Sequence, residues 1–202
     1  MEAPFFSNED LRQHAYQFLS DFNVNQTIPV PIELIVEQDL VIDIVPMPGL
    51  QGAFDVVAYI SADKTEIRVD EYVYYHRPER YRFSLAHEVG HWYLHSDLWG
   101  ELTFSTVTDW KNAVSQIPDK ENAFLEWHAN QFAGLILVPP CELQIVVDGE
   151  IEKLRAIGSS PSRFPMQQLT AAIAVPVARH FEVSTIVAER RIRDDQSLQR
   201  YY

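Results

Sequence analysis

The stretch His-Glu-Val-Gly-His at positions 87–91 combines residue types and spacing that can do chemistry. On a helix, residues four positions apart share one face, so His87 and His91 can reach a single metal ion. Neutral imidazole suits zinc, which also accepts a carboxylate oxygen. Glu88 is rotated by about 100° from His87, where it can touch a metal-bound water without ligating the ion. The pattern predicts Glu88 as the general base of a metal-assisted hydrolysis.

A plainer interpretation is that the two histidines lie on a solvated helix face. Their placement favours the metal site instead. The motif lies inside the strongest predicted helix, and its histidines avoid the apolar stripe of Tyr81, Leu85 and Val89.

A catalytic zinc needs a third protein ligand and one open position. His95 follows His91 by four residues, but it lies about 12 Å along the helix axis from His87 at 1.5 Å per residue. The long motif with a third histidine also needs a glycine turn after HExxH, and Trp92-Tyr93-Leu94 has none. We therefore expect His95 beside a ligand or on the surface.

Glu126, on the next strong helix, is the better candidate for the third ligand, and Glu121 is the alternative. Asn130 follows Glu126 by one turn on the same face, where it can bond the outer N–H of a histidine ligand. A site of two histidines and one carboxylate suits Zn²⁺ but also accepts Mn²⁺ or Fe²⁺.

Hydrophobic periodicity predicts the elements that position these residues. The first half of the chain reads as a helix at 8–22, a short helix at 31–37, a strand at 40–45 closed by Pro46 and Pro48, and strands at 54–60 and 66–70 that form a hairpin. The second half reads as a helix at 76–98, a loop at 97–120 with a strand near 102–107, and a helix at 120–137 stopped by Pro139 and Pro140. A helical region at 166–193 follows, interrupted at Pro176 or near Val183–Ser184. Few strands that do not alternate regularly with helices indicate the α+β class.

The composition describes a globular chain. Its 202 residues, of which 47% are hydrophobic, suffice for one buried domain, or for one with a small appendage. We see neither a run of about 18 apolar residues nor a secretory signal. The lone Cys141 cannot form an internal disulfide, and together these features favour the cytoplasm.

The net charge is −13. An acidic surface repels phosphate backbones, which argues against direct nucleic-acid binding. Solubility alone is enough to explain such acidity. A more specific interpretation is that the acidic surface binds a basic partner, such as a DNA-binding protein.

Two segments resemble a known family. RFSLAHEVGHWYLH (82–95), followed by EWHANQFAGLILVP (126–139), is similar to the ImmA/IrrE-like family of zinc metallopeptidases, and IPVPIELI and EIRVD also fit its N-terminal half. The resemblance implies a zincin-like fold with a small mixed or antiparallel sheet, an HExxH helix and a second ligand-bearing helix. It puts the metal ligands on His87, His91 and Glu126, and the base on Glu88. Gly134 and Leu135 depart from the family pattern without touching a motif ligand.

The resemblance also implies a function. Family members cleave helix-turn-helix repressors that are often encoded beside them, in mobile elements or stress responses, and others accompany such regulators in toxin–antitoxin-like pairs. A competing hypothesis is a non-catalytic binding partner of a DNA-binding regulator, with a structural or vestigial metal site. The intact Glu88 speaks against it, because a structural site does not need that carboxylate.

Other parts of the chain carry weaker expectations. The hairpin at 56–69 could bind an extended peptide by edge pairing. Segment 97–120 could form a flap through Trp99, Phe104 and Trp110, or simply pack on the surface. The candidates for oxyanion stabiliser are zinc itself, Tyr93, His95, His128 and Arg82.

We expect two regions, a metallopeptidase domain at 1–140 and a helical region at 141–202 packed on it. The tail at 178–194 (ARHFEVSTIVAERRIRD) resembles part of a helix-turn-helix. Acidic residues offset its arginines, so helix packing is favoured over DNA binding.

Overall fold

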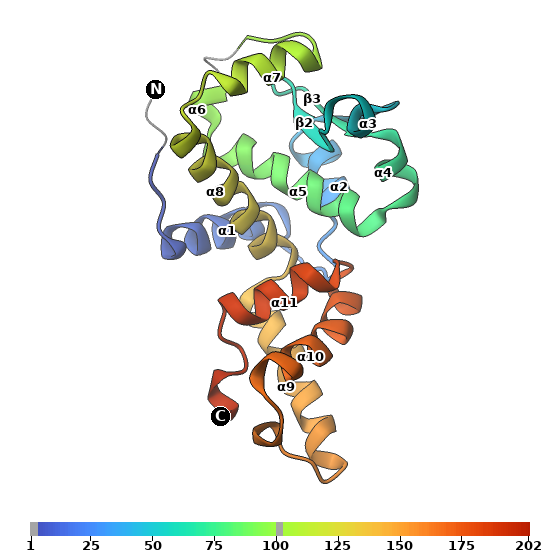
Figure 1. Cartoon of the computed structure of the whole chain (residues 1–202), viewed down its shortest axis with the longest axis vertical. Coiled ribbons are helices and arrows are strands. Elements are labelled where there is room, and N and C mark those ends of the chain that lie inside the picture. The colour runs from blue at the N-terminus through green and yellow to red at the C-terminus, as the bar shows by residue number, and fades with distance from the viewer. Residues whose placement is uncertain (1–3, 100–102) are drawn as a thin grey trace. The chain divides into compact units, whose positions relative to one another are not determined.

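The computed structural model describes residues 4–99 and 103–202 (Figure 1). The chain forms two compact units. The first comprises Met1–Thr27 and Pro31–Ile136, and the second comprises Ile28–Val30 and Leu137–Tyr202.

The first unit contains a three-stranded sheet in the order β1-β3-β2. Strand β1 (Asp43–Met47) runs parallel to β3 (Glu66–Asp70), whereas β2 (Ala58–Ile60) runs antiparallel to it. This small mixed sheet in a mostly helical chain confirms the α+β class. Pro46 lies inside β1, so the prediction that it closes the strand was wrong. An edge strand tolerates a residue without an N–H.

The predicted strand at 54–60 is correct only at its end. Leu50–Phe54 form a short helix, α3, which begins after Gly49 at φ 70° and ends at Asp55 at φ 56°. β2 starts at Ala58. The hairpin with β3 forms as predicted, with Tyr59 opposite Arg68.

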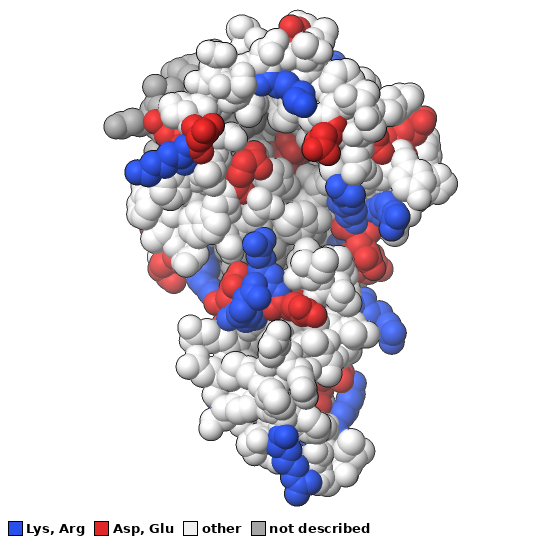
Figure 2. Space-filling view, in the orientation of Figure 1, with Lys and Arg blue, Asp and Glu red and all other residues white. Residues whose placement is uncertain are grey.

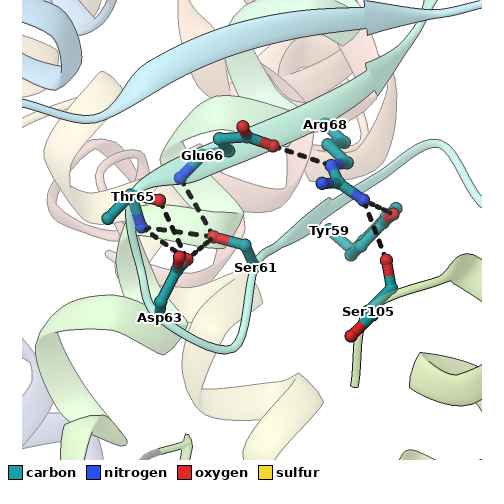
Figure 3. Close-up of polar contacts among 7 residues, drawn as sticks. All are labelled: Tyr59, Ser61, Asp63, Thr65, Glu66, Arg68 and Ser105. Atoms are coloured by element: carbon teal, nitrogen blue, oxygen red, sulfur yellow. Dashed lines mark hydrogen bonds and ion pairs between the residues drawn. The ribbon is translucent and has the colours of Figure 1, made fainter. Parts of the chain in front are cut away.

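Polar contacts hold this hairpin in a fixed shape (Figure 3). In its turn, the Ser61 hydroxyl donates to Asp63 at 2.6 Å and accepts from the Glu66 amide at 3.0 Å. On the strands, the Arg68 guanidinium donates to the Tyr59 hydroxyl at 3.0 Å. Lys64, also in the turn, donates to the Ser96 carbonyl at 2.7 Å. The edge strand β2 is therefore pre-organised.

Helix α1 (Asn8–Phe22) coincides with its prediction. Ser7 and Asp10 form a capping box at its start, which supplies partners for amides that a helix end leaves unbonded. The apolar face buries Leu11, Ala15 and Phe18. The short predicted helix after Pro31 is present as α2 (Ile32–Leu34), continued by a π-helical turn at Ile35–Asp39.

The predicted helix at 76–98 is three helices. Arg77, at φ −135° and ψ 65°, separates α4 (Glu71–His76) from α5 (Pro78–Leu94), because the residue before a proline avoids the helical region. His95 ends α5, and α6 (Ser96–Trp99) follows.

The prediction of a loop with a strand at 97–120 was wrong. Helix α7 (Val107–Ser115) fills much of this segment, and Thr106 and Asp109 form its capping box. Phe104 and Trp110 pack against a cluster that contains Leu50 and Tyr59, which favours surface packing over a flap. Leu102 and the Trp99 side chain lie outside the described part of the chain. Helix α8 (Asp119–Leu137) follows as predicted.

The second unit is helical. Helix α9 (Pro140–Ala156) was not predicted, because Pro139 and Pro140 read as a stop, yet a proline also suits the first turn of a new helix. Helix α10 (Met166–Phe181) runs through Pro176, and α11 (Thr185–Asp194) follows a break at which Glu182 adopts φ 52°. Of the two predicted interruptions, the one near Val183–Ser184 is correct.

Among the described residues, no single helix has the length and apolar composition to cross a membrane. Two bent helix pairs, α8 with α9 and α10 with α11, pass that test jointly on length and composition only.

Candidate metal centre

Three potential metal ligands converge between α5 and α8. The Nε2 atoms of His87 and His91 lie 3.1 Å apart. Glu126 reaches both, with Oε2 3.3 Å from His87 Nε2 and Oε1 3.3 Å from His91 Nε2. Tetrahedral zinc with bonds of about 2.0–2.1 Å needs ligand atoms about 3.3–3.4 Å apart. The three residues therefore fit a zinc ion in both donor type and spacing.

Gly90 explains how a residue of α8 reaches the histidines of α5. A Cβ built at Gly90 would lie 3.0 Å from Ala129 Cα and 3.2 Å from its carbonyl oxygen, closer than real Cβ atoms normally approach. Glycine lets the two backbones come this near without a shift of a few tenths of an ångström in α8. Ala129 lies about one turn after Glu126, so this close approach brings the Glu126 carboxylate to His87 and His91.

The centre is buried on one side and open on the other. The side chain of His91 is 3% exposed, whereas that of Glu126 is 46% exposed. Burial opposes the charge of Glu126, but its contacts with His87 and His91 outweigh burial and lower its pKa. For His87, burial opposes protonation, while Glu126, Glu88 and Asn130 outweigh it and raise the pKa. An open side leaves room for water and a substrate.

Glu88 lies beside the cluster of ligand atoms without joining it. Its Oε2 accepts a hydrogen bond from the backbone N–H of Ile60 in β2 at 3.0 Å, and the residue is buried. Burial raises the pKa of Glu88, against the opposing effect of His87 and His91. The carboxylate is thus held in one orientation next to the site, in surroundings that favour proton uptake.

The two residues predicted to support the ligands, Asn130 and His95, both lie next to them. Asn130 donates to the backbone carbonyl of Glu126 at 2.7 Å, and its side chain contributes to raising the pKa of His87. His95 Nδ1 lies 3.1 Å from His91 Nδ1, and the ring is buried. Glu121 lies in the first turn of α8, and the described donor cluster comprises His87, His91 and Glu126 instead.

His128 and Tyr93, two of the candidates for oxyanion stabiliser, contact other residues of the first unit. His128 is fully buried, with Nδ1 3.4 Å from His95 Nε2 and Nε2 accepting from the Phe6 amide at 3.4 Å. Tyr93 stacks on Phe132 at a ring distance of 5.4 Å. His128 and its partner His95 thus lie on the Nδ1 side of His91, away from the nitrogen that faces Glu126. Sequence reasoning missed this contact because 33 residues separate His95 from His128.

The negative charge belongs to the unit that holds this centre. Residues 137–202 contain eight acidic and eight basic side chains, so the net −13 comes from the rest of the chain. Figure 2 shows acidic and basic side chains interspersed on this face, without one patch of a single sign. The net negative charge of the first unit is therefore not gathered into a single acidic patch on the face drawn in Figure 2.

A family model agrees with these features. The model for the IrrE N-terminal-like domain, a peptidase family, matches residues 42–193, which include both helices of the centre. No curated protein matches the chain. Because the match covers most of the chain, this protein belongs to the IrrE N-terminal-like family of metallopeptidases.

Proposed function

We propose that this protein is a zinc-dependent endopeptidase in which His87, His91 and Glu126 hold the metal and Glu88 is the general base. The observation that carries the proposal is a buried carboxylate, fixed by Ile60, beside three residues whose nitrogen and oxygen atoms approach one another at 3.1–3.3 Å. When bound, zinc supplies Lewis-acid polarisation of a carbonyl and lowers the pKa of a coordinated water to about 7. The same donor set also accepts Mn²⁺ or Fe²⁺.

Glu88 has a defined task in this reaction. Its raised pKa suits a group that must take up a proton and release it within one turnover. With Oε2 held by the Ile60 amide, the other oxygen can take the proton of the attacking water. As the C–N bond breaks, Glu88 passes this proton to the leaving amine, and a new carboxyl group forms on the other fragment.

Strand β2 offers an edge for the peptide. Val57 accepts from the Asp70 amide and Ser61 donates to the Glu66 carbonyl, so both turn toward β3. Because backbone groups alternate along a strand, those of Ala58 and Ile60 point to the opposite side. The Ile60 N–H contacts Glu88, and an extended peptide can pair with the remaining groups by strand addition. Its scissile bond would then lie close to Glu88.

The substrate that we propose is a helix-turn-helix transcriptional repressor encoded nearby, in a mobile element, a stress response or a toxin–antitoxin-like pair. The family resemblance suggests it, and charge supports it. The unit that carries the candidate centre holds the whole net −13, which attracts the basic surface of a DNA-binding protein.

Direct DNA binding by this chain is less well supported. The break between α10 and α11 bends the pair by 112°, within the range of helix-turn-helix motifs. However, Arg191 is 2% exposed and pairs with Asp195 at 2.6 Å, so it is not presented to phosphate. The alternative of a non-catalytic partner protein leaves the buried Glu88 unexplained, because a structural site needs no base.

The test combines metal content with cleavage. Protein purified without chelator should carry one zinc per chain, and Glu126→Ala should carry much less. The wild type should cut the neighbouring repressor, whereas Glu88→Gln with full zinc should not. A wild type that remains metal-free after zinc addition, or a Glu88→Gln variant that still cleaves, contradicts the proposal.

A further inference from the structure

A row of imidazoles leads from His91 into the interior of the first unit. Between ring nitrogens, His91 Nδ1 lies 3.1 Å from His95 Nδ1, and His95 Nε2 lies 3.4 Å from His128 Nδ1. The far nitrogen of His128 accepts from the Phe6 amide at 3.4 Å. His95 and His128 are 1% and 0% exposed. Buried polar rings are stable only when their nitrogens find partners, and this row provides them.

The row ends at the nitrogen of His91 that faces away from Glu126. A histidine that ligates a metal through Nε2 depends on its outer nitrogen, because the contact there sets the orientation and tautomer of the ring. His95 makes that contact for His91. Ligation through Nε2 requires the proton of His91 to lie on Nδ1, so His91 would donate to His95 Nδ1 and His95 Nε2 would donate to His128 Nδ1. The His128 proton would then lie on Nε2, and the 3.4 Å contact that this nitrogen accepts from the Phe6 amide in the metal-free arrangement would be lost.

We propose that His128 is a positioning residue of the metal centre, which holds His95 and thereby keeps His91 Nε2 aimed at the metal. This inference rests on the metal site of the proposed function. Helix α8 would then contribute twice, with Glu126 as a ligand and His128 as the support of a ligand on α5. The N-terminal segment anchors the far end, where the Phe6 ring packs edge-on against His128 at 5.2 Å.

A purely structural role for His128 makes a different prediction. His128 also contacts Phe6 and Phe124, so it could simply fasten the N-terminal segment to α8. In that case substitution lowers the stability of the metal-free protein and leaves metal affinity unchanged. A positioning role instead changes the metal dissociation constant, in a way that depends on which ring nitrogen is replaced.

The test compares His128→Asn with His128→Gln. The amide of asparagine branches where Nδ1 stands in histidine, facing His95, whereas that of glutamine reaches the position of Nε2, facing Phe6. Chelator competition gives the zinc dissociation constant, and thermal unfolding of the metal-free form gives stability. Losing the outer partner of a ligand, here His95, usually costs about 10- to 100-fold in metal affinity. We expect His128→Gln to weaken zinc binding by part of that factor, and His128→Asn to stay closer to the wild type.

A double substitution and a matched control complete the experiment. If His128 acts through His95, replacing it in a His95→Phe background should add little further loss of zinc affinity. His14, whose ring also packs on Phe6 at 5.0 Å, gives the control His14→Phe, which should keep wild-type affinity. Wild-type affinity in His128→Gln, or full additivity with His95→Phe, overturns the inference. A wild type that binds no zinc overturns the proposed function as well.

Discussion

Glu88 accepts a hydrogen bond from the backbone N–H of Ile60 at 3.0 Å. The contact joins the candidate base on α5 to the edge strand β2, across 28 positions of sequence. A peptide paired with β2 would contact the same strand that holds the Glu88 carboxylate. The distance between the peptide and that carboxylate would then be set by the fold. If the proposed function holds, the base and the peptide substrate would both be positioned by strand β2.

Two substitutions at Glu88 should separate proton transfer from positioning. Glu88→Gln keeps the side-chain length and an acceptor for Ile60 but cannot take a proton, so kcat should fall by about 10²- to 10⁴-fold with metal content unchanged. Glu88→Asp keeps the carboxylate but withdraws it from Ile60, and an intermediate loss is expected. Steady-state cleavage rates with zinc analysis provide the measurement, and equal losses in both variants would argue against a positioning role for the Ile60 contact.

Gly90→Ala should loosen the metal centre. Its Cβ would meet Ala129 backbone at 3.0 Å, so α8 must move and carry Glu126 away from the histidines. We expect weaker zinc binding and lower stability. The matched control is Gly149→Ala, within α9, where nothing lies within 4 Å of the added Cβ. That change should stabilise the protein by about 0.5–1 kcal/mol, because alanine loses less backbone entropy in a helix. Calorimetry gives the stability of both variants, and zinc titration gives their metal affinity. If Gly90→Ala binds zinc as tightly as the wild type, the close approach of α5 and α8 at Gly90 does not position Glu126.

Metal binding should stabilise the folded chain. A ligand that binds only the native state at 100 times its dissociation constant adds about 2.7 kcal/mol to the free energy of unfolding. We expect Tm to rise with zinc and to return to the metal-free value with chelator. Glu126→Ala should remove most of this response, whereas Glu121→Ala, in the first turn of the same helix, should retain it. Equal responses of the two variants would show that Glu126 is not a ligand.

Zinc affinity should fall on acidification. In the metal-free protein the pKa of His87 is raised, because Glu126, Glu88 and Asn130 outweigh burial, which opposes protonation. Protonated His87 therefore stabilises the metal-free fold fully at pH values below its pKa in the unfolded chain, about 6.5. This stabilisation disappears as the pH rises through the raised pKa of His87 in the folded chain. Zinc competes with that proton for Nε2, so binding should weaken as pH falls through the raised pKa, already above about 6.5. Zinc dissociation constants measured from about pH 8 down to about pH 5.5 test this prediction. A dissociation constant that does not change with pH would argue against a histidine ligand.

Local residue patterns determined much of the fold by themselves. The apolar periodicity of 8–22 and 120–137 predicts helices that the structure contains, because a helix with one buried face repeats every 3.6 residues. The spacing of His87 and His91 likewise puts both rings on one side of α5, since this follows from the helix period alone. Local signals failed where they had two meanings. Pro140 was taken to end the preceding helix, but it is also the first residue of α9. In segment 97–120 a loop was predicted, although the segment contains the capping box that begins α7.

Only the tertiary structure decided what meets these histidines. That Glu126 rather than Glu121 reaches them depends on the approach of α8 to α5 at Gly90 and Ala129, which no periodicity records. The Ile60 amide at Glu88 depends in the same way on the sheet. Such contacts join residues tens of positions apart, and their geometry is set by how complete elements pack. The sequence therefore determined the residue types available for the chemistry, and packing determined which of them stand together.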